Sequence, residues 1–264
     1  MKNIDIRAIL AEWPFDPARN IRVARFADGR MLLQVRLPMG LEQYEMKGRP
    51  DGLKPHGLDS ELAFHLRRLD RAKEAGIEPA FRLNHAACEP LFEESTLFYL
   101  RYVRFLEMED WARTLRDTTH NLRLFDLVHQ YAESPDDRLY LEQWRPFLIR
   151  IHALAGAMVQ MSKDRPAKAI HLLQEAVTRI KALPLLNREA FAAETRRSLS
   201  ELNGLLKRFR DQVPPSPADR LDRELRLAVE AENYERAAEL RDQLKALLAP
   251  KNKPKPKTES ATDR

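Results

Sequence analysis

The chain has 264 residues, of which 45 are Lys or Arg and 40 are Asp or Glu. This length suits one large domain or two small ones, and 44% apolar residues can supply a buried core. The single cysteine, Cys88, excludes an internal disulfide and CxxC zinc knuckles, so a reducing cytoplasm is expected. No apolar run has the length of a signal peptide or a bilayer span, so no membrane partner is expected.

The formal charge of +5 is distributed unevenly along the chain. Residues 249–264 hold five Lys and Arg against two acids, residues 219–248 hold six against eight, and residues 1–218 hold 34 against 30. Phosphate binding needs a local surplus of Lys and Arg. The sequence therefore confines weak, non-specific nucleic-acid binding to the Lys- and Pro-rich tail, 249–264, which we expect to be disordered.

The N-terminal segment, residues 1–57, is the only one with a β pattern. After a short helix near residues 4–11, residues 21–37 form two runs around Asp28-Gly29, a hairpin turn signal. In the second run Met31, Leu33, Val35 and Leu37 alternate with less apolar residues, and residues 41–47 are a candidate third strand. A small antiparallel sheet is predicted.

A compact loop, GRPDGLKPHG, covers residues 48–57. Pro50 suits the second position of a tight turn and Gly52 its end. Exposed backbone N–H groups with Arg49, Lys54 and His56 nearby make this a possible anion-binding loop. No Walker or dinucleotide pattern accompanies it, so a turn that joins sheet to helix is the favoured interpretation.

Residues 58–212 have helical periodicity. A helix from a cap at Asp59 to about Ala75 would end at a left-handed Gly76, and Pro90 would open another to about Met108. Further helices are expected from Trp111, from Ser134 to a break or kink at Pro146, from Pro166 to Leu183 and from Asn187 to Asp211.

Three polar turns, near Asp110, Asp164 and Asn233, each separate two apolar helices. Their unequal spacing argues against a strict repeat. The predicted fold is therefore mainly α, with helical hairpins packed side by side, loosely like tetratricopeptide units, behind the small sheet.

Two groups of residues have spacings that occur in catalytic or metal sites. His85 and Cys88 have HxxC spacing, but no second ligand pair lies near, so a buried Cys and a surface His are favoured and no metal is expected. Asp117, His120 and Asn121 fall within one helical turn, where Asp117 could orient His120 for acid–base work. An intrahelical polar contact is the favoured alternative, so no catalytic residue and no cofactor is expected.

A row of aromatic residues could be read as an RNA-stacking strip. Arg101 and Arg104 lie among the aromatic residues of this stretch, which are Phe98, Tyr99, Tyr102 and Phe105. At helical spacing, a core face with the arginines on the outer face is the favoured interpretation.

The most informative segment is the helical hairpin at residues 220–248, which follows a Pro-rich linker, 213–219. Asn233 is expected to take the left-handed conformation of its turn. Two helices alone cover one face poorly, so the apolar stripe needs the body or another hairpin to cover it. The stripe consists of Leu221, Leu225, Ala228, Val229, Tyr234, Ala237, Ala238, Leu244 and Leu248.

This segment resembles the UVR motif, a helical hairpin of UvrB, UvrC, some Clp-type ATPases and the adaptor McsA. The matching residues are Leu221, Leu225, Ala228, the Glu232-Asn233-Tyr234-Glu235 turn, Ala237-Ala238, Arg241-Asp242 and Leu247. Tyr234 stands where the family usually has Phe. The resemblance implies a protein–protein interaction module and adds Arg241 and Asp242 to its interaction residues.

The N-terminal two hundred residues are similar to uncharacterised bacterial UVR-motif proteins that carry a GRPDGxxPHG-like loop. The leading hypothesis is a non-enzymatic cytoplasmic adaptor or scaffold that docks a protein partner, or a second copy, through the hairpin. Family analogy suggests DNA repair or Clp-type protein quality control. The alternatives are a nucleic-acid-binding accessory protein that uses the basic tail, and a small-molecule enzyme with a pocket between the GRPDG loop and the Asp117/His120 face.

Overall fold

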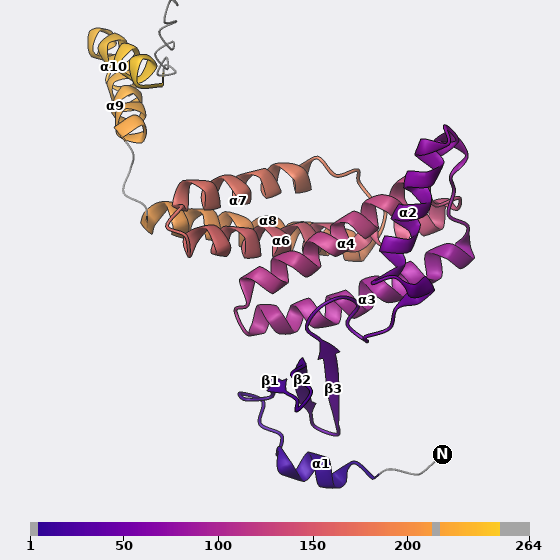
Figure 1. Cartoon of the computed structure of the whole chain (residues 1–264). Coiled ribbons are helices and arrows are strands. Elements are labelled where there is room, and N and C mark those ends of the chain that lie inside the picture. Colours follow the sequence, from indigo (N-terminus) through magenta and orange to yellow (C-terminus); the bar gives the residue numbers. More distant parts are fainter. Residues whose placement is uncertain (1–4, 213–216, 249–264) are drawn as a thin grey trace, which may run out of the picture. The chain divides into compact units, whose positions relative to one another are not determined.

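A computed structural model describes residues 5–212 and 217–248 (Figure 1). The chain divides into two compact units, Met1–Lys207 and Arg208–Arg264, and the boundary falls inside helix α8, Glu189–Gln212. The tail at 249–264 and most of the predicted linker, 213–216, lie outside the described residues. Within the described part, no helix is long and apolar enough to cross a membrane.

The first unit begins with helix α1, Arg7–Glu12, and a three-stranded antiparallel sheet in the order β1-β2-β3. The strands are β1, Ile21–Arg25; β2, Met31–Leu37; and β3, Gly40–Glu45. Gly29 has φ +82° in the β1–β2 turn, which the N–H of Phe26 closes on the Arg30 carbonyl at 2.8 Å. Leu33 of the central strand faces Val23 on one side and Tyr44 on the other. The predicted sheet and turn are confirmed.

One face of the sheet packs on helix α3, His85–Glu107. Phe105 of α3 is fully buried in a cluster with Leu33, Val35, Tyr44 and Met46. Because strand residues on one face recur every second position, Leu33 and Val35 reach this cluster together. The sheet is thereby fixed to the helical body, while Arg36 of β2 also donates to the Trp13 carbonyl at the end of α1, at 2.7 Å.

The GRPDG loop leads from the sheet to helix α2, Glu61–Glu74, through a short 3₁₀ turn, η1, Pro55–Gly57. Its tight turn is as predicted, since the N–H of Gly52 bonds the Arg49 carbonyl at 3.0 Å. The cap of α2 is Ser60, not Asp59, because the Ser60 hydroxyl accepts from the Ala63 N–H at 2.9 Å. Gly76 ends the helix with φ +71°, as expected.

The described part of the helical body continues through six more helices, of which the last is α8. Helix α3 begins at His85, five residues before Pro90, because the Asn84 side chain caps it there. Pro146 lies at the second position of a helix, where a missing N–H costs nothing, so the predicted break falls just before it. The remaining helices are α4, Trp111–Tyr131; α5, Pro135–Tyr140; α6, Arg145–Met161; and α7, Pro166–Lys181, with 3₁₀ turns η2, Glu78–Ala80, and η3, Glu142–Trp144.

The second unit contains the helices α9, Pro217–Glu230, and α10, Tyr234–Leu248. The α9–α10 turn has the same backbone as the α3–α4 and α6–α7 turns. Each has an acidic residue with φ between 53° and 56°, namely Glu109, Asp164 and Glu232. The N–H of the next residue bonds the carbonyl five residues back, as in a Schellman motif. The expectation that Asn233 is left-handed is wrong, because Glu232 takes that conformation.

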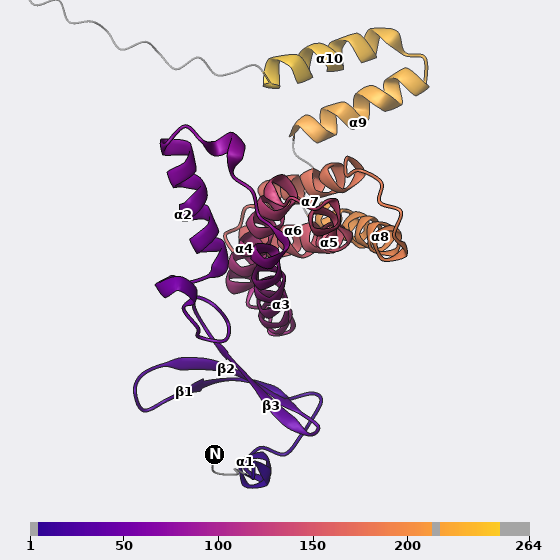
Figure 2. The ribbon, with the colours of Figure 1, turned by 90° about the vertical axis from the view of Figure 1, so that its right-hand side faces the viewer.

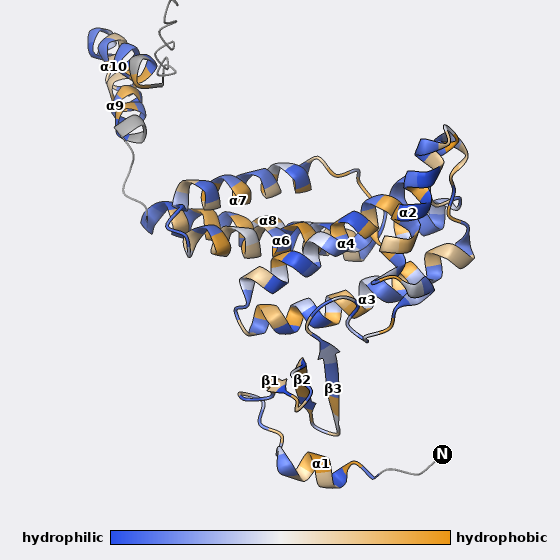
Figure 3. Cartoon of the chain, in the orientation of Figure 1, coloured by the Kyte–Doolittle hydropathy of each residue, from blue (hydrophilic) through white to orange (hydrophobic). Residues whose placement is uncertain are grey.

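Within the first unit, α3 packs on α4, α4 on α6, and α6 on α7 (Figure 2). Hydrophobic and hydrophilic stripes alternate around these helices (Figure 3). Side chains such as Leu124, Leu148 and Leu173, one from each of α4, α6 and α7, are at most 1% exposed. The predicted body of side-by-side helical hairpins is confirmed.

A buried ion pair joins three parts of this unit. The Arg101 guanidinium is fully buried and makes two hydrogen bonds to Asp117 of α4, at 2.7 and 2.9 Å. It also donates to the Glu45 carbonyl at the end of β3, at 2.7 Å. Burial lowers the pKa of Arg101 while Asp117 opposes that shift. Arg104 faces Glu42 of β3 at 3.6 Å, so the prediction that both arginines lie on the outer face is wrong.

We expect Asp117→Asn to lower the free energy of unfolding by about 3–5 kcal/mol, because it leaves the buried Arg101 without its counter-ion. Asp126→Asn is the matched control: its carboxylate faces Arg145 at 2.7 Å but is 65% exposed, so we expect a loss below about 1 kcal/mol. Urea denaturation of both variants measures the difference. Equal losses would contradict the role of the buried pair.

Candidate functional site: the C-terminal helical hairpin

The hairpin turn is fixed by local hydrogen bonds. The N–H of Asn233 reaches the Ala228 carbonyl at 2.9 Å and so closes the last turn of α9. The Asn233 side chain then caps α10 by accepting from the Arg236 N–H at 3.1 Å. Asn233 is therefore needed as a cap, not for a left-handed backbone.

Five residues form the small internal core of the hairpin. Ala228, Ala237 and Leu240 are buried, and the partly buried Leu221 and Leu225 pack against them. Leu240 is only 1% exposed. Paired small residues let the two helices approach closely at the turn, and Leu240 fills the space beyond them. Sequence reasoning identified all of these positions except Leu240, which belongs to the same stripe as Ala237 and Leu244.

The other predicted interaction residues have different surroundings. Leu244 is half-buried, Ala238 is exposed, and Leu248 ends α10 with a side chain outside the described part. Arg241 and Asp242 are exposed and pair with each other at 3.1 Å. The structure therefore separates the predicted interaction residues into those that hold the hairpin together and those that face solvent.

Among the hairpin residues that the structure describes, four large apolar side chains are exposed: Leu227 by 56%, Val229 by 49%, Tyr234 by 68% and Leu247 by 51%. Leu227, Val229 and Tyr234 lie within eight positions around the turn, and we call them together the turn-end surface; because they are two positions apart, Leu227 and Val229 lie on different sides of α9. Leu247 lies at the opposite end of the hairpin. Leu227 was absent from the predicted interaction residues because it falls outside the stripe that closes the core.

The charges on the hairpin are mostly paired within it. Arg236 bridges to Glu239 at 2.8 Å and across to Glu224 of α9 at 3.7 Å, while Arg226 pairs with Asp222 at 3.0 Å. These exposed pairs contribute little stability. They leave no surplus of cations for phosphates, in keeping with the acidic balance of the segment.

Of the loop residues Arg49, Lys54 and His56, only Arg49 and His56 share a partner, the Glu61 carboxylate, at 4.0 and 3.3 Å. Arg49 turns inward to Asp51 at 3.1 Å and Glu94 at 3.6 Å. Lys54 is exposed and faces Asp59 at 3.7 Å. Each of these three side chains already faces a carboxylate of the chain itself.

Glu94 of α3 is the hub of this region. Its buried carboxylate accepts the N–H groups of Glu61 and Leu62, at 2.7 and 3.1 Å, at the start of α2. His120 lies 3.0 Å away from it and stacks on Phe98 with 3.6 Å between ring centroids. Asp117 faces Arg101 instead, so the idea that Asp117 orients His120 is wrong. The first N–H groups of a helix have no partner within the helix, and a carboxylate at the N-terminus can accept them. Glu94 therefore holds the N-terminus of α2 on α3.

The two residues with HxxC spacing, His85 and Cys88, differ in burial. Cys88 is fully buried, which raises the pKa of its thiol, while the His85 side chain is 68% exposed and lies 2.9 Å from Asp137. The favoured interpretation of a buried Cys and a surface His is confirmed. In the described residues, 5–212 and 217–248, no group of His, Cys, Asp and Glu is arranged to hold a metal ion.

Comparison with known protein families identifies the hairpin. Residues 217–249 match the family described as the UvrB/uvrC motif, and this match coincides with α9 and α10. The chain therefore carries a UVR motif in its second unit. No curated protein and no solved structure matches the chain.

We expect Leu240→Ala to cost the hairpin about 2–5 kcal/mol, the usual range for a buried leucine. Because two helices of this length are marginally stable, that loss should remove amide hydrogen-exchange protection from α9 and α10 and spare the first unit. Hydrogen exchange of the full chain measures it. The matched control is Leu247→Ala, on the same helix but 51% exposed, and equal deprotection in both variants would contradict the internal core.

Proposed function

We propose that this chain is a non-enzymatic, cytoplasmic adaptor that docks a protein partner, or a second copy, through the turn-end surface of its UVR hairpin. The carrying observation is the exposure of Leu227, Val229 and Tyr234 on a hairpin whose core is already closed around Leu240. Single exposed apolar residues are ordinary, whereas a group of them on a small element is typical of an interaction site.

The physical reason is the geometry of two helices. A helical hairpin has one internal face, and here that face is filled by small residues and Leu240. The turn-end surface therefore adds nothing to the stability of the hairpin. Covering it against another protein would remove three apolar side chains from water, and Tyr234 can bury its ring while its hydroxyl stays hydrogen-bonded.

The motif narrows the search for a partner. It takes its name from UvrB and UvrC, so we propose DNA repair as the first system to examine, with Clp-type protein quality control as the second. A nucleic-acid role through the Lys-rich tail concerns residues 249–264, which lie outside the described part. The paired charges of the hairpin give that role no support.

The test is a double variant of the full chain, Val229→Ser with Tyr234→Ser, compared with Leu247→Ser. Both sets change exposed side chains, so the hairpin should remain helical by circular dichroism. We expect light scattering to show a dimer of the wild-type chain, or crosslinking to give a complex with a partner protein in which the crosslinks map to residues 217–248. The double variant should lose that species, and Leu247→Ser should retain it.

A monomeric wild-type chain without any crosslink at the hairpin would overturn the proposal. So would a double variant that associates normally. If removal of residues 249–264 abolishes the complex and nuclease treatment does the same, the nucleic-acid alternative replaces the adaptor.

A further inference from the structure

A second surface of the first unit has the properties of a binding site. Helix α2 turns Leu62, His65 and Leu69 inward and leaves three arginines on its outer side, Arg67, Arg68 and Arg71. We call these three the α2 cationic face. Burial lowers the pKa of His65 to about 4, so that histidine adds no positive charge to the face at neutral pH.

The three guanidinium groups have no carboxylate partner among the described residues. Arg68 lies over the rings of Phe64 and Phe81, at 5.7 and 5.6 Å. Lys73, in contrast, faces Glu78 at 4.0 Å. Asp70 and Glu74 are exposed on the same helix but pair with none of these arginines. Elsewhere in this unit, Arg49, Arg104 and Arg145 all face carboxylates.

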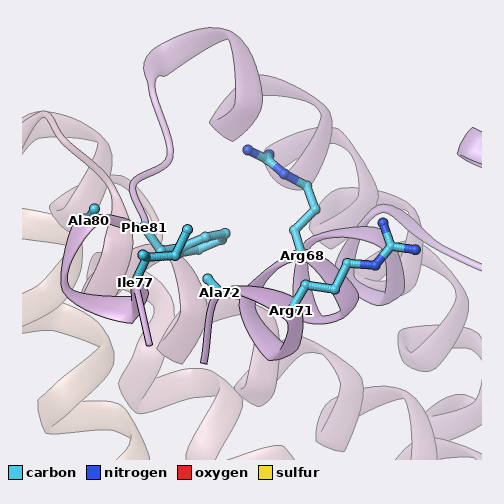
Figure 4. A pocket seen from close by; sticks show the side chains of 6 residues that line it. All are labelled: Arg68, Arg71, Ala72, Ile77, Ala80 and Phe81. Atoms are coloured by element: carbon cyan, nitrogen blue, oxygen red, sulfur yellow. The ribbon is translucent and has the colours of Figure 1, made fainter. Parts of the chain in front are cut away.

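Two open hollows lie beside these arginines, and both are lined by Arg68 and Arg71. The larger one, about 300 Å³, has an apolar side made by Ala72, Ile77, Ala80 and Phe81. Figure 4 shows Ile77 and Phe81 pointing from the following segment toward Arg68 and Arg71. Ile77 is 59% exposed, so its side chain is available for contact.

The second hollow continues the surface along α2 toward the GRPDG loop. It measures about 210 Å³ and adds Arg67, Phe64, Leu58 and His56 to the lining. The His56 ring stacks on Phe64 with 3.8 Å between centroids. The face thus presents apolar and cationic groups side by side in two adjoining hollows.

We propose that the α2 cationic face docks an acidic peptide segment of a partner protein. A bulky apolar residue of that segment enters the hollow beside Ile77, and flanking Asp or Glu side chains pair with Arg67, Arg68 and Arg71. Guanidinium groups bind carboxylates through paired hydrogen bonds, and the rings below Arg68 hold it in place. This site is independent of the hairpin.

A peptide fits these observations better than a nucleic acid. The hollows have an apolar side, which suits an aliphatic or aromatic side chain. Asp70 and Glu74 are exposed on the same helix, and a continuous chain of phosphates along it would be repelled by them. A peptide with few carboxylates between apolar residues brings less negative charge to these acids.

The experiment measures fluorescence anisotropy of a short labelled peptide of Glu, Leu and Tyr with the full chain. Two variants test the two halves of the site: Arg68→Gln with Arg71→Gln, and Ile77→Ser. We expect the double variant to weaken binding by about tenfold, since it removes two of the three guanidinium groups that pair with the peptide carboxylates. The Ile77→Ser variant should bind the peptide of Glu, Leu and Tyr only as tightly as the wild-type chain binds a labelled peptide of Glu and Ser.

The matched controls are Arg123→Gln with Arg196→Gln, which removes the same charge from exposed sites on α4 and α8, and Leu185→Ser, a 95% exposed leucine. Both should bind the peptide as the wild type does. The proposal is overturned if the peptide does not bind, if both arginine pairs act equally, or if oligothymidylate binds these arginines more tightly than the peptide. None of these outcomes alters association through the hairpin, so the two proposals fail separately.

Discussion

A helical hairpin can bury only one of its faces by itself, and this constraint governs the architecture of the whole chain. The same Schellman turn, with an acidic residue at positive φ, joins α3 to α4, α6 to α7 and α9 to α10. In the first unit, α4 also packs on α6, so those two hairpins cover each other. The hairpin of the second unit contains only the core around Leu240 and leaves apolar side chains exposed at its turn.

Polar groups, not apolar area alone, determine how the first unit is assembled. Arg101 connects the end of β3 to Asp117 of α4, and Glu94 of α3 satisfies the first N–H groups of α2. Buried charges of this kind are costly unless they are fully paired. Such pairs penalise any packing in which the sheet or α2 shifts along α3, because a shift would leave a buried charge alone. The unit therefore has one geometry for α2, which holds its arginines in fixed positions.

Much of this fold can be predicted from the sequence, because its signals are local. Asp28-Gly29 indicates the β-hairpin, Gly76 the end of α2, and the periodic apolar residues the helices of the body. The wrong predictions concern positions where a neighbouring residue, or a residue distant in the sequence, determines the helix boundary or the burial of a side chain. Ser60 caps α2 in place of Asp59, and Asn84 starts α3 well before Pro90. Helical periodicity assigned Arg101 to the surface, since no local pattern shows that Asp117 will meet it inside.

The candidate site is predictable to the same degree. The UVR motif is a local pattern, and it identified the hairpin and most of its core. Whether an apolar residue of the hairpin packs in the core or faces solvent depends on the side of the helix on which it lies. Leu225 packs against the core, whereas Leu227, two positions further on, is exposed. The α2 cationic face was not found from the sequence, because α2 as a whole holds four bases against three acids and shows no marked surplus of charge. Only the fold shows that, among the described residues, Arg67, Arg68 and Arg71 have no carboxylate partner and lie beside an apolar hollow.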